Sequence, residues 1–172
     1  MKHPPKPADP LDPAAIGPCF YFKIKRLSRL IGRCYDPFLN EIGLKGTQFS
    51  LLSAIYQLGA PSTGELSHVL GLDRTTLTRN TTVLIEKNWI TTEKKSRHNH
   101  YRLTNEGKAI FTKALPLWRH AQQALRHQVG AQQWDSFLHE VDVVASSLQT
   151  PFAQKNASQP VALIDAVHRK QG

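Results

Sequence analysis

Two short helices joined by a tight turn are the feature of this sequence that most constrains its fold. Ser62 and Glu65 have the spacing of a capping box, which starts a helix that ends at Gly71. Asp73 then fits the N-cap of a second helix, which should run to about Asn88 and bury Leu77, Leu84 and Ile85. Two helices separated by a short turn that contains glycine predict a helix-turn-helix.

A basic β-hairpin is predicted directly after this helix pair. Residues 89–94 (WITTEK) and 100–104 (HYRLT) are rich in β-formers, and residues 95–99 (KSRHN) between them are typical of a polar tip. A further helix is expected before the pair, at residues 47–59. The order of three helices and a hairpin is that of a winged helix-turn-helix, in which the hairpin is the wing.

Long helices are predicted on both sides of this unit. Gly17-Pro18 is a helix start signal, and Pro37 should bend or interrupt the first helix near its end. The apolar stripe of that helix consists of Phe20, Ile24, Leu27, Ile31, Cys34 and Phe38. A second long helix should start at Thr104 and kink at Pro116, and Gly130 should separate it from a last helix. The fold class is therefore mainly α with a small β-hairpin wing.

Charge and composition limit the functions that this chain can have. Its 172 residues are enough for one domain with a core, and its formal net charge of +9 favours a polyanionic partner such as nucleic acid. No stretch approaches the roughly 18 consecutive apolar residues of a membrane span, and residues 1–13 have no apolar run like that of a signal peptide. We therefore expect a cytoplasmic protein.

Catalytic and metal-binding motifs are missing from the sequence. It has no nucleophile elbow, P-loop, HExxH zinc motif or glycine-rich dinucleotide fingerprint, so we expect no enzyme activity and no cofactor. The two cysteines do not form a CxxC pair, and the eight histidines are scattered, so no metal site is expected either.

The candidate DNA contacts lie on the second helix of the pair and on the hairpin. Arginine and threonine in the first turns of such a helix can read base edges and bind phosphates, while basic side chains of a wing can reach phosphates or the minor groove. On the helix pair the candidates are Thr63, Arg74, Thr75, Thr76, Thr78, Arg79 and Asn80. On the hairpin they are Lys94, Lys95, Arg97 and His98.

Three segments carry a resemblance to a known family. They are residues 43–52 (GLKGTQFSLL), residues 70–80 (LGLDRTTLTRN) and the LTxxG motif at residues 103–107. Their sequence and order resemble the MarR family of bacterial transcription regulators over roughly residues 18–148. The resemblance implies a homodimer, held by its N- and C-terminal helices, that binds a pseudo-palindromic DNA operator as a repressor and is released by a small ligand or by cysteine oxidation.

The wing departs from the family pattern at one position. The arginine with which the family reads the minor groove corresponds to Arg97, six positions before the leucine of the LT pair. The family usually has an acidic residue two positions before that arginine, where this chain has Lys95. We therefore expect this wing to bind phosphate more strongly and to read sequence less rigidly.

The resemblance divides the chain into five parts. Residues 1–15 are a proline-rich, disordered arm, residues 16–45 an N-terminal dimerisation helix, and residues 46–104 the DNA-binding lobe. Residues 105–150 are the C-terminal dimerisation helices, and residues 151–172 are a linker and tail. A pocket for a small-molecule effector is implied between the dimerisation helices and the lobe, with candidate lining residues Phe20, Tyr35, Phe38 and Trp118, although the same side chains serve equally well as core.

Two further questions stay open at this level. Cys19 is expected at the second helical position after Pro18, where free amides and the helix dipole favour a reactive thiolate, so redox sensing is an alternative to ligand binding. This position resembles the organic-peroxide-sensing branch of the family, whereas Cys34 is expected in the core. The basic residues of the first helix either touch phosphate or only aid solubility and steering. A non-specific, architectural nucleic-acid-binding protein is the third possibility.

Overall fold

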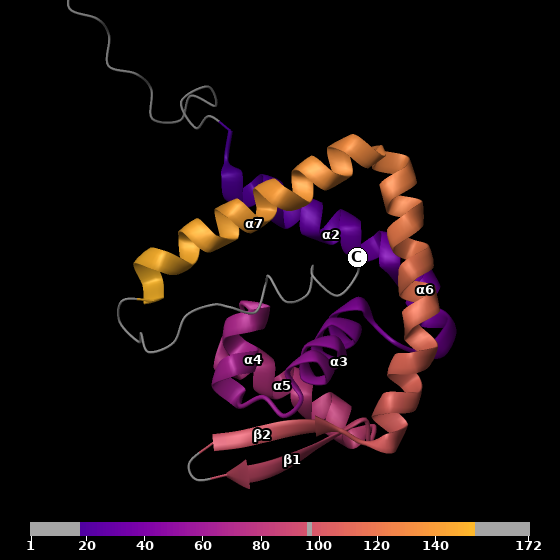
Figure 1. Cartoon of the computed structure of the whole chain (residues 1–172), viewed down its shortest axis with the longest axis vertical. Coiled ribbons are helices and arrows are strands. Elements are labelled where there is room, and N and C mark those ends of the chain that lie inside the picture. Colours follow the sequence, from indigo (N-terminus) through magenta and orange to yellow (C-terminus); the bar gives the residue numbers. More distant parts are fainter. Residues whose placement is uncertain (1–17, 96–97, 154–172) are drawn as a thin grey trace, which may run out of the picture. The chain divides into compact units, whose positions relative to one another are not determined.

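The computed structural model describes residues 18–95 and 98–153. Figure 1 shows a mainly helical chain with one two-stranded sheet, which confirms the predicted fold class. The elements are α2 (Phe20–Leu39), the 3-10 helix η1 (Asn40–Ile42), α3 (Gly46–Leu58), α4 (Thr63–Leu70), α5 (Arg74–Glu86), β1 (Ile90–Lys95), β2 (His98–Leu103), α6 (Asn105–Val129) and α7 (Ala131–Ala153). The chain divides into two compact units after Leu125, inside α6.

The helix α2 begins two residues later than its proline signal predicts. Cys19 is the N-cap, and its sulfur accepts a hydrogen bond from the amide of Phe22 at 3.5 Å, so the cysteine precedes the helix instead of occupying its second position. Pro37 does not interrupt α2, which continues to Leu39. Pro37 lies in the last turn of α2, directly before η1. Only two residues of the helix follow the backbone hydrogen bond that the proline lacks.

The helix pair α4 and α5 forms as its capping signals predict. The carboxylate of Glu65 accepts from the amide and hydroxyl of Ser62, both at 2.7 Å, and the amide of Glu65 donates to that hydroxyl at 3.3 Å. Gly71 ends α4 in the left-handed region at φ 61°, which glycine adopts without steric cost. The prediction for Ile85 is wrong: its side chain is 39% exposed, because it lies to one side of the buried face of α5.

The hairpin is longer than the sequence suggested. β1 and β2 pair antiparallel from Ile90 opposite Leu103 to Lys95 opposite His98, so three residues that we had placed in the tip belong to the strands. The hairpin is also attached to the start of α4: the amide of Tyr101 donates to the carbonyl oxygen of Pro61 at 2.9 Å, and a β-bridge joins Ser62 to His100.

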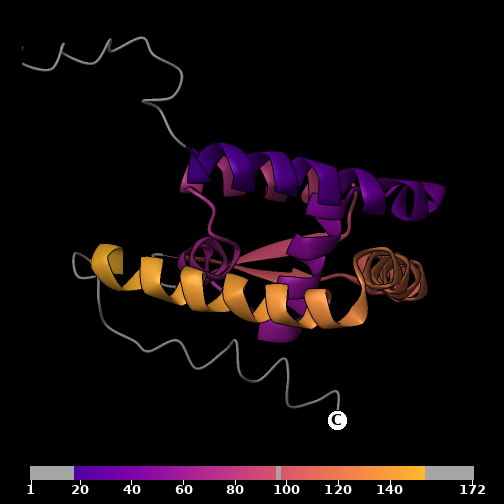
Figure 2. The same cartoon turned by 90° about the horizontal axis from the view of Figure 1, so that it is seen from above.

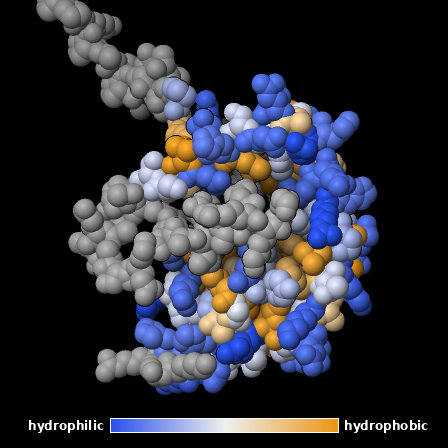
Figure 3. Space-filling view, viewed as in Figure 1, coloured by the Kyte–Doolittle hydropathy of each residue, from blue (hydrophilic) through white to orange (hydrophobic). Residues whose placement is uncertain are grey.

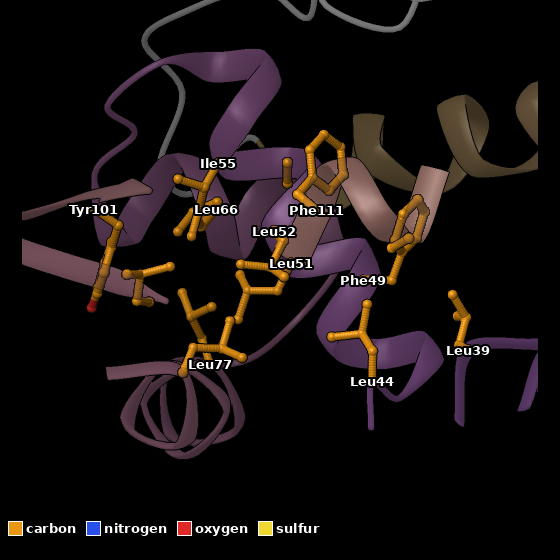
Figure 4. Packing of buried hydrophobic residues seen from close by; sticks show 14 residues of the cluster. Leu39, Leu44, Phe49, Leu51, Leu52, Ile55, Leu66, Leu77, Tyr101 and Phe111 are labelled. Carbon is orange, nitrogen blue, oxygen red and sulfur yellow. The ribbon is translucent and has the colours of Figure 1, made fainter. Parts of the chain in front are cut away.

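The core of the first unit lies where α3 meets α4, α5, the hairpin and α6. Figure 4 shows leucines of α3 and α5 directed at one another, with Phe111 of α6 beside them. The ring of Phe49 stacks on both Phe111 and Trp118, with centroids 5.6 Å apart in each pair. Figure 2 shows α3 running crosswise to α2. The buried cluster thus joins α4, α5 and the hairpin to α3 and α6.

The LTxxG motif joins the hairpin to α6. The hydroxyl of Thr104 donates to the carbonyl oxygen of Asn88 at 2.6 Å and accepts from the amide of Gly107 at 2.9 Å. The backbone of Gly107 lies so close to the carbonyl group of Trp89 that an added Cβ would be 2.7 Å from the carbonyl carbon. Glycine is therefore required here by close approach of two backbone segments.

The C-terminal helices differ from the prediction at one end. α6 is assigned as one continuous helix through Pro116, and Gly130, at φ 92°, separates it from α7. α7 extends to Ala153. Residues 151–153 are therefore helical, whereas we had predicted a linker there. The predicted arm at residues 1–15 and the tail at residues 154–172 lie outside the described residues. No helix among the described residues is long and apolar enough to cross a membrane.

Candidate nucleic-acid interface

Four of the predicted contact residues line one shallow depression on the outer face of α5. The depression has a volume of about 390 Å³, and its lining residues are Arg74, Thr75, Thr78 and Arg79. All four side chains are exposed, while Leu77 on the opposite face is fully buried in the core. Burial of that leucine fixes the rotation of the helix, so the two cations and two hydroxyls face outward together.

The start of α5 is capped by Asp73. Its carboxylate accepts from the amide of Thr76 at 2.9 Å and from the hydroxyl of Thr76 at 2.7 Å. The bond from the Thr76 amide is the main reason why the pKa of Asp73 lies below its usual value. The hydroxyl of Thr76 is thus already used within the helix, and the half-buried side chain of Asn80 faces outward less than its neighbours.

Thr63 faces the wing as well as its own helix start. Its hydroxyl lies 3.4 Å from the carbonyl oxygen of Asn99 and 3.5 Å from the hydroxyl of Tyr101. These weak contacts connect the first turn of α4 with β2. Thr63 therefore contributes to the placement of the hairpin beside the helix pair.

Thr82 is a residue that the sequence analysis missed. It is exposed, one turn beyond Thr78, and its hydroxyl donates to the carbonyl oxygen of Thr78 at 2.9 Å. It lies seven positions after Thr75, which returns to the same face of a helix. This spacing could have identified Thr82 from the sequence, because it extends the outward face of α5 by a second turn.

Three of the four predicted contact residues of the hairpin lie in its two strands. Lys94 and His98 are exposed strand residues, and the backbone of Lys95 pairs with His98. Glu93 and Arg102 form a loose ion pair across the hairpin at 3.9 Å. Arg97, the predicted minor-groove residue, lies outside the described residues.

Three of the four predicted effector-pocket residues, Tyr35, Phe38 and Trp118, lie in contacts between α2, α3 and α6, whereas Phe20 lies apart from them. The hydroxyl of Tyr35 donates to the side-chain oxygen of Gln122 at 2.6 Å, and burial raises the pKa of Tyr35 to about 12. The ring of Phe38 makes an edge contact with His120, and Trp118 stacks on Phe49. Phe20 starts α2, about 22 Å along the helix from Tyr35 at ~1.5 Å per residue.

The cysteines and histidines add little to this interface. Cys19 is an exposed free thiol, and Cys34 is a half-buried free thiol. Within residues 18–95 and 98–153, no group of three or more histidine, cysteine or acidic side chains has the geometry of a metal site.

Known proteins share this combination of fold and sequence. A model of the MarR family matches residues 44–97. The M. tuberculosis transcriptional regulator MosR in complex with DNA is 30% identical over 77% of this chain and 98% of its own, with a TM-score of 0.69. The chain belongs to the MarR family. Its hairpin and helix pair are the winged helix of that family.

More distant members share the fold of this MarR-family protein. The oxidised form of E. coli MarR is 23% identical over 74% of this chain and 94% of its own, with a TM-score of 0.62. Bordetella bronchiseptica BpsR, whose DNA binding is described as regulated by 6-hydroxynicotinic acid, is 15% identical over the same shares, with a TM-score of 0.68. A search among curated proteins finds no match.

Proposed function

We propose that this MarR-family protein is a sequence-specific, DNA-binding transcription regulator. The observation that carries the proposal is the outward face of α5, where Arg74, Thr75, Thr78 and Arg79 lie side by side and exposed. Arginine forks bind guanine or phosphate, and threonine offers a hydroxyl to phosphate and a methyl group to thymine. The DNA-bound structure of MosR supports the same use of this fold.

The test is selection of duplexes from a random-sequence pool by the purified full-length protein. We expect one pseudo-palindromic sequence to be enriched and to bind at least about 10³-fold more tightly than random duplex at physiological salt. Equal binding to both would contradict sequence-specific recognition and favour a non-specific, architectural protein.

We propose that the regulator acts as a homodimeric repressor in the cytoplasm, where bacterial DNA is found. Apolar side chains that a single copy leaves exposed support the dimer, because such patches mark protein contacts. On α2 they include Phe20 and Ile24, and on α7 they include Phe137, Val141 and Val144. Figure 3 shows hydrophobic side chains that reach the surface between hydrophilic ones. Sedimentation should give a dimer at micromolar concentration, and a monomer would contradict this part of the proposal.

Release by a small ligand is the proposed switch. The regulation that the BpsR structure describes is a precedent within the fold. In this chain, the contacts of Tyr35, Phe38 and Trp118 between α2, α3 and α6 are where a ligand would alter the position of the DNA-binding lobe. A ligand that separates the protein from its selected duplex should also raise its melting temperature.

Cysteine oxidation is the second candidate switch. The Sγ atom of Cys19 is exposed at a helix N-cap, where it accepts a hydrogen bond from the amide of Phe22 at 3.5 Å. Peroxide should then release the selected duplex from the wild-type protein and leave Cys19→Ser bound. Release that is equal in the wild type and Cys19→Ser would exclude this thiol as the switch.

A further inference from the structure

The helix α2 carries two different faces along its length. Its apolar stripe returns at Phe20, Ile24 and Ile31, and exposed cations lie on the opposite side. We call these cations the outer basic face, which consists of Lys25, Arg26, Arg29 and Arg33. Because the two faces are about half a turn apart at ~100° per residue, a second copy that covers the stripe leaves the outer basic face exposed.

This charge distribution weakens the helix that carries it. Arg29 lies four positions from both Lys25 and Arg33, and like charges at this spacing repel each other. α2 also has no acid in its first turn and no cation in its last turn, so it lacks both charge placements that the helix dipole favours.

Between the residues that the structure describes, no ion pair offsets this repulsion. Residues 19–35 contain no aspartate or glutamate, and between described residues no carboxylate forms an ion pair with the outer basic face. Two arginines elsewhere in the described part of the chain do form ion pairs, Arg126 with Asp135 at 2.9 Å and Arg102 with Glu93 at 3.9 Å. A surface selected only for solubility would mix the two signs. An external anion therefore accounts for the unmixed charge of α2 better than solvation does.

The outer basic face is separate from the proposed operator-binding surface. The contacts of α2 with the rest of the first unit are near its C-terminal end, where Leu39 is buried and Tyr35 reaches Gln122. Figure 1 shows α2 on one side of α3 and the hairpin on the other, and both belong to the same compact unit. A duplex that contacts the wing is thus on the far side of α3 from α2.

We infer that the outer basic face binds the phosphate backbone of a second DNA segment, distinct from the operator. From Lys25 to Arg33 the helix rises about 12 Å at ~1.5 Å per residue, which faces about three to four phosphates of one strand at ~3.4 Å spacing. Three of the four cations are arginines, whose planar fork suits phosphate oxygens. The protein thereby bridges two DNA segments, a role beyond operator recognition.

The test is a two-duplex capture with the full chain. The protein is loaded on an immobilised duplex that carries its selected site, and a labelled random-sequence duplex is added. We expect the wild type to retain the labelled duplex and Arg29→Gln/Arg33→Gln to retain about tenfold less. The control, Lys113→Gln/Arg119→Gln, removes the same charge from exposed positions of α6 and should behave as the wild type.

A second arm removes the dependence on a selected site. In the Arg79→Ala background, the salt slope of random-duplex binding should fall by about 1.8 when Arg29 and Arg33 are replaced by glutamine, at ~0.9 per phosphate contact. The inference is overturned if Arg29→Gln/Arg33→Gln leaves the salt slope unchanged or captures the labelled duplex as well as the wild type does. It is also overturned if the wild type, offered phosphatidylserine vesicles in place of the labelled duplex, binds the vesicles and not the duplex. A loss of dimer in the α2 variant would overturn it too, since the cations would then bind the second copy. If the wild type selects no site, only the proposed function fails, because the salt slope on random duplex still tests the outer basic face.

Discussion

Replacement of Gly107 by alanine should destabilise the protein severely. The new Cβ would lie 2.7 Å from the carbonyl carbon of Trp89, whereas carbon atoms pack at about 3.5–4.0 Å, so two backbone segments must separate by about 1 Å. Overpacking typically costs about 1–3 kcal/mol. Separation also weakens the bonds from the Thr104 amide to Trp89 and from the Gly107 amide to Thr104, at about 1 kcal/mol each.

The gain in helix propensity, about 1 kcal/mol for alanine over glycine, offsets part of this cost. We therefore expect the free energy of unfolding to fall by about 2–4 kcal/mol in equilibrium urea denaturation. Gly64→Ala is the control, because the nearest atom to its new Cβ is the hydroxyl of Ser62 at 3.9 Å and no loss is expected. A fall of less than about 0.5 kcal/mol in Gly107→Ala would refute the close approach of the two backbone segments.

Two other substitutions test polar contacts of the fold. Hydrogen bonds from the Ser62 amide and hydroxyl lower the pKa of Glu65. Ionised Glu65 therefore stabilises the fold fully above its unfolded pKa of about 4.3. This stabilisation is lost as the pH falls through the lower pKa of the folded state. Acid denaturation should thus show a weaker pH dependence in Glu65→Gln than in the wild type, and identical curves would contradict the capping box. Tyr35→Phe should cost about 1 kcal/mol by leaving Gln122 without its donor. Because folding favours the neutral phenol, the stability from Tyr35 should be lost between about pH 10 and the folded pKa of about 12, and alkaline denaturation of the two proteins should differ only there.

Local signals predicted the recognition elements well. The capping roles of Ser62 and Asp73 depend on side chains within three residues, so the spacing of polar residues was enough to place the starts of α4 and α5. The alternation of apolar residues likewise predicted burial of Leu77 and Leu84. These interactions form within one helix and leave a direct mark on the sequence.

Contacts between distant segments could not be predicted in this way. The hairpin tip was wrong because the pairing of Lys95 with His98 depends on cross-strand hydrogen bonds and not on β-propensity. The reason for Gly107 was hidden because its neighbour, Trp89, lies in another segment. The sequence also grouped Phe20 with Tyr35 by residue type, although the length of α2 separates them.

Binding of Arg79→Ala to the selected duplex tests the central claim most directly. If Arg79 reads a base from the outward face of α5, its loss should cost about 1–3 kcal/mol on the selected duplex and much less on random duplex, which narrows the ratio between them. Arg119→Ala, an exposed arginine on α6, should leave that ratio unchanged. An equal loss of affinity for both duplexes in Arg79→Ala would contradict base reading by α5 and reduce its role to phosphate contact.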